Sequence, residues 1–110
     1  MPPVEQDALI YGPIRVELLT HKVLAQGKFV RLAKMEYRLL CYLILHEGQV
    51  LSRQEILTNI WNLPPNVKTR TLDMHIHTLR KKLGLADYWE TVLQVGYRLR
   101  SIGKKEESPR

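Results

Sequence analysis

The chain has 110 residues, which is enough for one domain around a single modest hydrophobic core. Its composition, with 45% hydrophobic and 25% charged residues, is that of a soluble globular domain, and no apolar run reaches the roughly 18 residues that a membrane span needs. The net charge of +6 favours a polyanionic partner, and the first residues do not have the pattern of a signal peptide.

The two ends of the chain differ from its middle. Residues 1–8 are polar and contain prolines, so we expect a linker remnant or a frayed end there. Residues 102–110 show no periodicity, and we expect a disordered tail. Residues 9–101 are predicted to form the single folded domain.

The first part of this domain has a strand pattern. Between residues 14 and 18, apolar side chains alternate with charged ones, as in a half-buried strand. Residues 23–25 and 28–32 flank a Gln-Gly pair that can form a hairpin turn. With residues 10–11 ahead of them, these segments predict a small antiparallel sheet.

The most apolar stretch of the sequence is predicted to be the first helix. Residues 35–46 are apolar at nearly every position, so we expect a helix buried on all sides, and Gly48 to end it. The only cysteine, Cys41, lies within this stretch and cannot form an internal disulfide, which fits a reducing cytoplasm. We expect Cys41 to be an inert core residue rather than a reactive thiol.

A second helix is predicted to begin at a capping box. The Ser52 hydroxyl can accept from the amide of residue 55, and Glu55 can reach back to the amide of residue 52. This helix is expected to run to about Trp61, before a Pro-Pro pair breaks the chain. The side chains expected to face the core are Ile56, Leu57 and Ile60.

A third helix is predicted from about residue 67 to residue 83, followed by a terminal hairpin. Its narrow apolar stripe consists of Leu72, Ile76, Leu79 and Leu83. Gly84 is expected to end it. Residues 91–93 and 97–100 then have the pattern of two strands joined by a short turn.

The outer face of the third helix carries a basic pattern. Opposite the apolar stripe lie Arg70, Met74, His77, Thr78 and Lys81, with Arg80 and Lys82 beside them. A helix with one apolar edge and a basic outer face fits the major groove of DNA. Cations are also common in the last turn of a solvated helix, where they meet the negative end of its dipole, so the pattern alone leaves both interpretations open.

Catalytic and metal-binding patterns are absent from the sequence. His75 and His77 are two positions apart, so on a helix they point about 200° apart and cannot chelate one metal ion. No glycine loop for phosphate, catalytic carboxylate pair or nucleophile elbow is found. We therefore predict no enzyme activity, no cofactor and no metal, and we expect His75 to be a packed or hydrogen-bonded structural residue.

Several segments resemble the OmpR/PhoB-type effector domain of bacterial two-component response regulators. The similar segments are residues 32–40 at the first helix, 48–57 with Ile60-Trp61 at the second, 70–84 at the recognition helix, and 91–92 with 95–98 at the wing. The resemblance covers roughly residues 10–101. It implies an α+β winged helix-turn-helix fold with an N-terminal antiparallel four-stranded sheet, three helices and a C-terminal β-hairpin wing.

The resemblance also implies a function and a set of site residues. The helix at about 67–83 is expected to enter the major groove and the wing at about 91–100 to reach the minor groove, as the output domain of a response regulator. The expected DNA-binding residues are Trp61, Arg70, Met74, His77, Thr78, Arg80, Lys81, Thr91 and Arg98. The loop between the second and third helices, with Leu63, Pro64, Pro65 and Asn66, is expected to contact RNA polymerase. Further expected partners are direct-repeat DNA bound as a dimer and an N-terminal receiver domain; no membrane is expected.

The chain departs from the family pattern at four positions. Thr78 and Leu93 stand where relatives often have arginine, Gln94 where a glycine is common in the wing turn, and Ala33 where a threonine caps the first helix. The alternative function is therefore a winged-helix protein-interaction module whose DNA binding is weak or lost. The retained cations at 70, 80 and 81 favour DNA binding.

Overall fold

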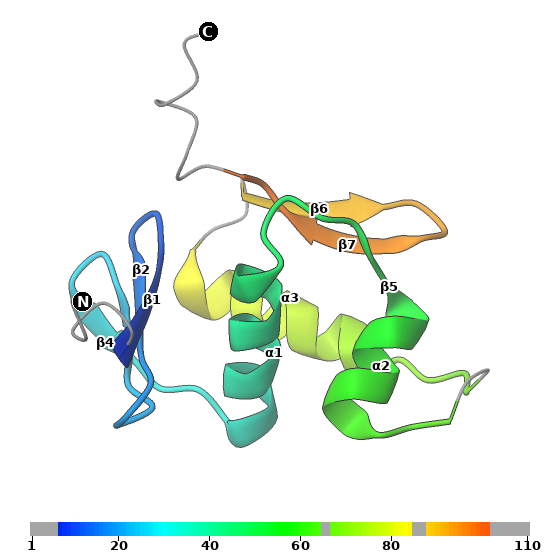
Figure 1. Cartoon of the computed structure of the whole chain (residues 1–110), viewed down its shortest axis with the longest axis horizontal. Helices are drawn as coiled ribbons and strands as arrows, with labels where there is room; N and C mark the ends of the chain where they lie inside the picture. Colours follow the sequence, from blue (N-terminus) through cyan, green and yellow to red (C-terminus); the bar gives the residue numbers. More distant parts are fainter. Residues whose placement is uncertain (1–6, 65–66, 85–87, 102–110) are drawn as a thin grey trace, which may run out of the picture.

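The fold consists of three helices placed between two small antiparallel sheets (Figure 1). It was obtained as a computed structural model that describes residues 7–64, 67–84 and 88–101. The elements follow each other as predicted from the sequence: a sheet, three helices and a hairpin. The expected linker at 1–8 and tail at 102–110 lie almost wholly outside the described residues.

The N-terminal sheet has the four antiparallel strands that the sequence predicted. They are β1 (Ala8–Tyr11), β2 (Ile14–Glu17), β3 (Val23–Ala25) and β4 (Lys28–Val30), in that order across the sheet. The alternation in β2 is confirmed, because Ile14 and Val16 are buried while Arg15 is exposed. β1 already begins at Ala8, one residue before the expected start of the domain.

The first helix, α1 (Lys34–Leu45), is not buried on all sides as its composition suggested. Leu45 is 65% exposed, and Cys41 is only partly buried. The helix packs on its neighbours along one face, so apolar side chains on the other face remain near solvent. It ends at Leu45 with His46 as its cap, so Gly48 is not the cap; Gly48 has a φ of +87° and shapes the turn that follows. Burial raises the pKa of the Cys41 thiol and keeps it protonated, which supports an inert role.

The other two helices are α2 (Arg53–Trp61) and α3 (Thr71–Leu83). The capping box of α2 is confirmed: the Glu55 amide donates to Ser52 Oγ at 3.0 Å, and the Ser52 amide donates to Glu55 Oε1 at 3.1 Å. α3 begins four residues later than predicted, because the Thr69 hydroxyl accepts from the Thr71 amide at 3.1 Å and closes the preceding loop. Gly84 ends it in a left-handed conformation with φ +66°, as expected.

The C-terminal sheet contains one strand more than predicted. β6 (Trp89–Val92) and β7 (Gly96–Leu99) form the wing, and the two-residue β5 (Leu51–Ser52) pairs with β7 on its other side. Gly96 makes this pairing possible, since a Cβ at that position would lie 1.8 Å from the Leu51 carbonyl oxygen. The wing is thus anchored beside the start of α2.

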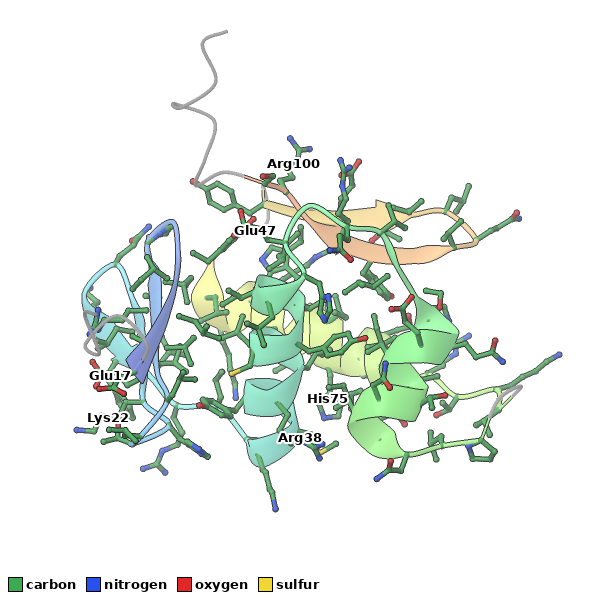
Figure 2. All side chains as sticks on the ribbon, in the orientation of Figure 1. Glu17, Lys22, Arg38, Glu47, His75 and Arg100 are labelled. Atoms are coloured by element: carbon green, nitrogen blue, oxygen red, sulfur yellow. The ribbon has the colours of Figure 1, made fainter. Side chains whose placement is uncertain are left out.

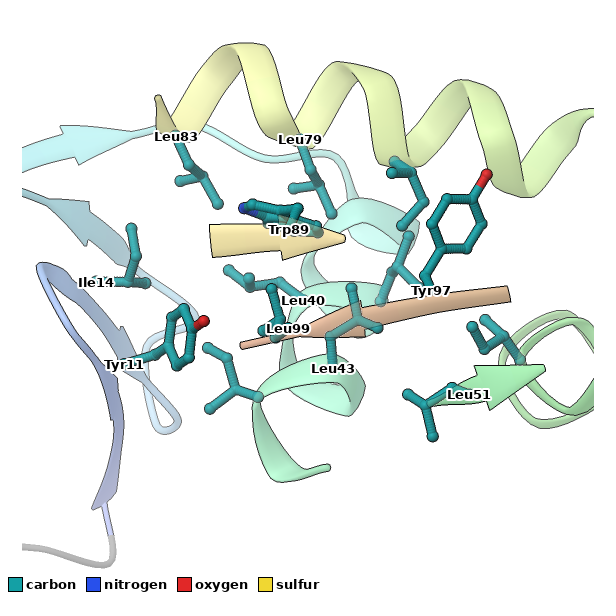
Figure 3. Packing of buried hydrophobic residues seen from close by; sticks show 14 of the residues in the cluster. Tyr11, Ile14, Leu40, Leu43, Leu51, Leu79, Leu83, Trp89, Tyr97 and Leu99 are labelled. Carbon is teal, nitrogen blue, oxygen red and sulfur yellow. The ribbon is translucent and has the colours of Figure 1, made fainter. Parts of the chain in front are cut away.

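The hydrophobic core lies where the helices meet the wing on one side and the N-terminal sheet, with Tyr11 and Ile14, on the other. Figure 3 shows Leu79 and Leu83 of α3 pointing toward Trp89 of the wing, with Leu40 of α1 nearby. The whole predicted stripe of α3 is buried, with at most 4% of any of its four side chains exposed. None of the helices among the described residues is long and apolar enough to cross a membrane.

Candidate nucleic-acid interface

The outer face of α3 presents the side chains that the sequence placed there. Met74 is 65% exposed, and Arg70, His77 and Lys81 are also exposed. Thr78 is partly exposed, and its hydroxyl donates to the Met74 carbonyl of the same helix at 3.0 Å. A shallow hollow in this surface is lined by Arg70, Asp73, Met74, His77 and Thr78. The buried stripe on the opposite side holds this face toward solvent.

The two cations of this outer face, and the histidine between them, have no internal partner among the residues that the structure describes. Within residues 7–64, 67–84 and 88–101, no hydrogen bond or ion pair engages the side chains of Arg70, His77 or Lys81. Arg80 differs, because its Nη2 donates to Thr91 Oγ1 of the wing at 3.1 Å, while its buried Nε has no hydrogen-bond partner in the described part of the chain. Since Thr91 is neutral, the charge of Arg80 is not compensated by this contact.

Two other cations near this surface are paired with carboxylates. Arg98 donates to Glu90 Oε1 across the wing strands at 2.6 and 2.9 Å, so its charge is compensated locally. Lys82 donates to Glu36 Oε1 at 2.7 Å and to the Arg31 carbonyl at 3.2 Å, which joins the end of α3 to the start of α1. The structure therefore separates free cations from cations that hold the fold together.

Glu36 completes half of a cap at the start of α1. Its Oε1 accepts from the Ala33 amide at 2.9 Å, but Ala33 offers no side-chain acceptor in return. Burial alone would raise the pKa of Glu36, but the hydrogen bonds from Lys82 and from the Ala33 amide outweigh it and lower that pKa. The carboxylate is therefore held in its charged form at neutral pH.

Trp61 and His75 meet at the junction of α2 and α3. Their rings lie edge to face with centroids 5.1 Å apart, and His75 Nδ1 is 2.9 Å from the Thr71 carbonyl oxygen. Figure 2 shows His75 on the side of α3 that faces α2. The predicted structural role of His75 is confirmed. Trp61 stays partly exposed beside it, at the edge of the α3 surface.

The tip of the wing is uncharged and exposes two apolar side chains. Leu93 is 81% exposed and Val95 is 48% exposed, and between them Gln94 has a left-handed φ of +64°. That conformation favours glycine, which is the residue that the resemblance associates with this position. From residue 91 to residue 97 the wing has no charged side chain.

The loop between α2 and α3 is described only in part. Leu63 packs against the core, and Pro64 is exposed. Pro65 and Asn66, which the sequence assigned to the same contact surface, lie outside the described residues. Asn62 ends α2 in a left-handed conformation with φ +57°.

One cluster of polar side chains was missed by the sequence analysis. Asp73 of α3 contacts Arg53 at the start of α2 and Tyr97 of the wing. These partners lie 20 and 24 positions from Asp73, so no local spacing could reveal them. Asp73 also lines the hollow on the outer face of α3.

Comparisons with known proteins agree with this architecture. The family model described as "Transcriptional regulatory protein, C terminal" matches residues 27–99. The response regulator protein PmrA of Pseudomonas aeruginosa is 36% identical over 89 residues, covering 81% of this chain and 40% of PmrA. The phosphate regulon transcriptional regulatory protein PhoB of Rhizobium meliloti is 37% identical over 103 residues, covering 91% of this chain and 45% of PhoB. The chain thus spans less than half the length of these curated relatives.

Solved structures give the same result for the fold. The chain is similar to the Klebsiella pneumoniae RstA DNA-binding domain, whose crystal structure is of a complex with the RstA box. The TM-score is 0.78 at 27% sequence identity, and the match covers 84% of this chain and 96% of that one. The predicted winged helix-turn-helix, of class α+β, is therefore confirmed.

Proposed function

The chain belongs to the family of C-terminal domains of transcriptional regulatory proteins of OmpR/PhoB type, and on this premise we propose that it binds double-stranded DNA sequence-specifically to regulate transcription. The observation that carries the proposal is the exposed outer face of α3, where no other described residue pairs with the cations Arg70 and Lys81 or with the neighbouring His77. Unpaired cations on a helix that its apolar stripe fixes to the core are suited to a polyanion.

In the proposed complex, α3 enters the major groove. Met74, His77 and Thr78 face the base edges, because they occupy the middle of the outer face. Arg70 and Lys81 near the two ends of the helix contact phosphates, which gives affinity without sequence preference. Donors and apolar groups at the centre of the face then supply the discrimination.

The remaining proposed contacts flank α3. Arg80 and Thr91 lie together where the helix meets the wing, and Trp61 lies on the α2 side. All three are proposed to lie near the DNA backbone. Arg98 is proposed to contribute less, because Glu90 compensates its charge. The wing tip is proposed to reach the minor groove with the apolar side chain of Leu93.

The wider assembly is also proposed from the family. We propose that the chain is the output part of a two-component response regulator with an N-terminal receiver domain, acts in the cytoplasm, and binds direct repeats as a dimer. Contact with RNA polymerase is proposed for the loop that contains Leu63 and Pro64, continuing through Pro65 and Asn66. We further propose that the domain itself has no enzyme activity.

A second candidate function is a protein-interaction module. The observation in its favour is the exposure of apolar side chains on the proposed DNA surface, namely Met74, Leu93 and Val95. An apolar surface of this kind can bind a protein partner without any dependence on phosphates.

Selection of bound sites from a random duplex pool distinguishes the two functions. We expect the purified domain to enrich one sequence pattern and to bind the selected duplex at least about 1,000-fold more tightly than a scrambled one. The double variant Arg70→Ala/Lys81→Ala is expected to bind the selected duplex more weakly, and Lys22→Ala/Lys28→Ala, which removes the same charge beside and within the N-terminal sheet, is the matched control. No enrichment by a folded domain, or equal binding by both double variants, would contradict the proposal.

A further inference from the structure

Asp73, in the first turn of α3, is held by side chains from two other elements. Arg53 at the start of α2 donates through Nη1 to both carboxylate oxygens, at 2.8 and 2.9 Å. The Tyr97 hydroxyl of β7 donates to Asp73 Oδ1. The Tyr97 side chain is 9% exposed, so its hydroxyl reaches Asp73 from the core side of the wing. One carboxylate therefore joins α2, α3 and the wing.

A second contact between α3 and the wing lies two helical turns further on. Arg80 donates to Thr91 Oγ1 at 3.1 Å. Asp73 and Arg80 are seven positions apart and so lie on one side of the helix. Thr91 and Tyr97 are directly paired across β6 and β7. The four residues form a frame with one edge in the recognition helix and the other in the wing.

Arg53 connects this frame to the neighbouring loops. Its Nη2 donates to the Thr69 carbonyl at 2.8 Å, in the segment that leads into α3. Its backbone amide donates to the Val95 carbonyl at 3.2 Å, in the wing turn. Its guanidinium also compensates the charge of Asp73, which would otherwise repel phosphates from the outer face of α3.

We infer that Asp73 is a positioning residue that fixes the wing against the recognition helix. The frame sets the distance between the apolar tip at Leu93 and the outer face of α3. The inference rests on the proposed DNA-binding function. A fixed distance favours a duplex whose major groove fits α3 while its minor groove fits the wing, because the protein then loses less conformational freedom on binding. Phosphate contacts alone are made with any sequence, so non-specific binding does not need the frame.

The variant Tyr97→Phe tests this role, because it keeps the buried ring and removes only the hydroxyl. We expect its affinity for the selected duplex to fall about fivefold, because a wing that is less firmly fixed loses more conformational freedom on binding. Affinity for a scrambled duplex, and the slope of affinity against salt, are expected to stay unchanged. Tyr42→Phe is the matched control, since the Tyr42 hydroxyl contacts Glu55 and Asn59 of α2 and, among the described residues, bonds to neither α3 nor the wing strands.

A double-mutant cycle separates positioning from a general loss of stability. We expect Leu93→Ser to weaken binding to the selected duplex in the parent protein and to weaken it at least about threefold less in the Tyr97→Phe background. The free energies of unfolding are expected to be additive for the same pair, because Leu93 is exposed. Additive binding effects, or equal behaviour of Tyr97→Phe and Tyr42→Phe, would overturn the inference while leaving DNA binding intact. If the parent protein does not distinguish the selected from the scrambled duplex, the proposed function fails and the inference fails with it.

Discussion

The outer face of α3 and the tip of the wing differ in charge. Among the described parts of the chain, the face of α3 carries the cations Arg70 and Lys81 without internal partners, whereas the wing tip presents Leu93 and Val95. The cation of the wing strands, Arg98, is paired with Glu90. On the proposed function, the helix supplies electrostatic affinity and the wing supplies apolar contact.

This difference separates two components of binding that usually act together. Electrostatic attraction to phosphates falls steeply with salt, while apolar contact depends on the shape of the groove and hardly on salt. A cation that is paired inside the protein does not add to the first component. Counting basic residues therefore overestimates the number of phosphate contacts. Only a cation without an internal carboxylate partner adds fully to the electrostatic affinity.

The largest expected effect is that of Gly96→Ala, which disturbs the pairing of the wing strand β7 with β5. The added Cβ would lie 1.8 Å from the Leu51 carbonyl oxygen, so β5 and β7 would have to separate. We expect a loss of about 3 kcal/mol in the free energy of unfolding, measured by urea denaturation. Val95→Ala, at the exposed neighbouring position, should change it by no more than about 0.5 kcal/mol. A stable Gly96→Ala protein would show that the wing is not fixed on β5.

The next effect concerns the free cation at the start of α3. Arg70→Ala is expected to weaken binding to all duplexes by about 1.5 kcal/mol and to reduce the salt slope by about one unit. Arg98→Ala should reduce that slope by clearly less, because Glu90 already compensates its charge. Fluorescence anisotropy at a series of salt concentrations measures both slopes. Equal changes in the two variants would remove the distinction between free and paired cations.

A smaller effect is expected when the wing tip receives a charge. Leu93→Arg should tighten binding by about 1 kcal/mol, because an arginine in the minor groove gains a charge-assisted contact. The gain should be largest on duplexes with an A·T-rich flank and should shrink as salt is added. Leu93→Gln, which adds polarity without charge, is the control. Unchanged affinity of a folded Leu93→Arg protein would show that the wing does not approach the groove.

The smallest effect concerns a paired cation of α3. Lys82→Met should lower the free energy of unfolding by about 0.5 to 1 kcal/mol at neutral pH, because it removes the partly exposed ion pair with Glu36. The salt slope of DNA binding should stay unchanged, because this pairing compensates the charge of Lys82. The pKa of Glu36 is lowered in the folded state, so its pairing contributes stability above its unfolded pKa of 4.5, and this stability is lost as the pH falls through the folded pKa. Denaturation at pH 7 and at low pH should show the difference between the two proteins disappearing in acid. A difference that persists in acid would exclude the pairing as its cause.

Features encoded within a few residues could be predicted from the sequence. The Ser52–Glu55 capping box and the buried stripe of α3 depend on spacings of three or four positions, and both are present as expected. The face of α3 followed from the same helical period. The overall topology followed from the resemblance and is confirmed by the fold.

Contacts between distant parts of the chain could not be predicted in the same way. Lys82 contacts Glu36 across 46 positions, and Tyr97 contacts Asp73 across 24, so neither pair leaves a local pattern. The two-residue β5 is too short to show a strand period. The apolar content of α1 likewise could not tell which face meets its neighbours, and Leu45 is exposed as a result.

The salt dependence of DNA affinity in two double variants tests the division between helix and wing most directly. Arg70→Ala/Lys81→Ala removes the free cations of α3, and Leu93→Ser/Val95→Ser removes the apolar tip. We predict that the α3 variant loses about two units of salt slope, and that the wing variant keeps the slope of the parent protein but discriminates less between selected and scrambled duplexes. An unchanged slope in the α3 variant, or a flattened slope in the wing variant, would contradict this account.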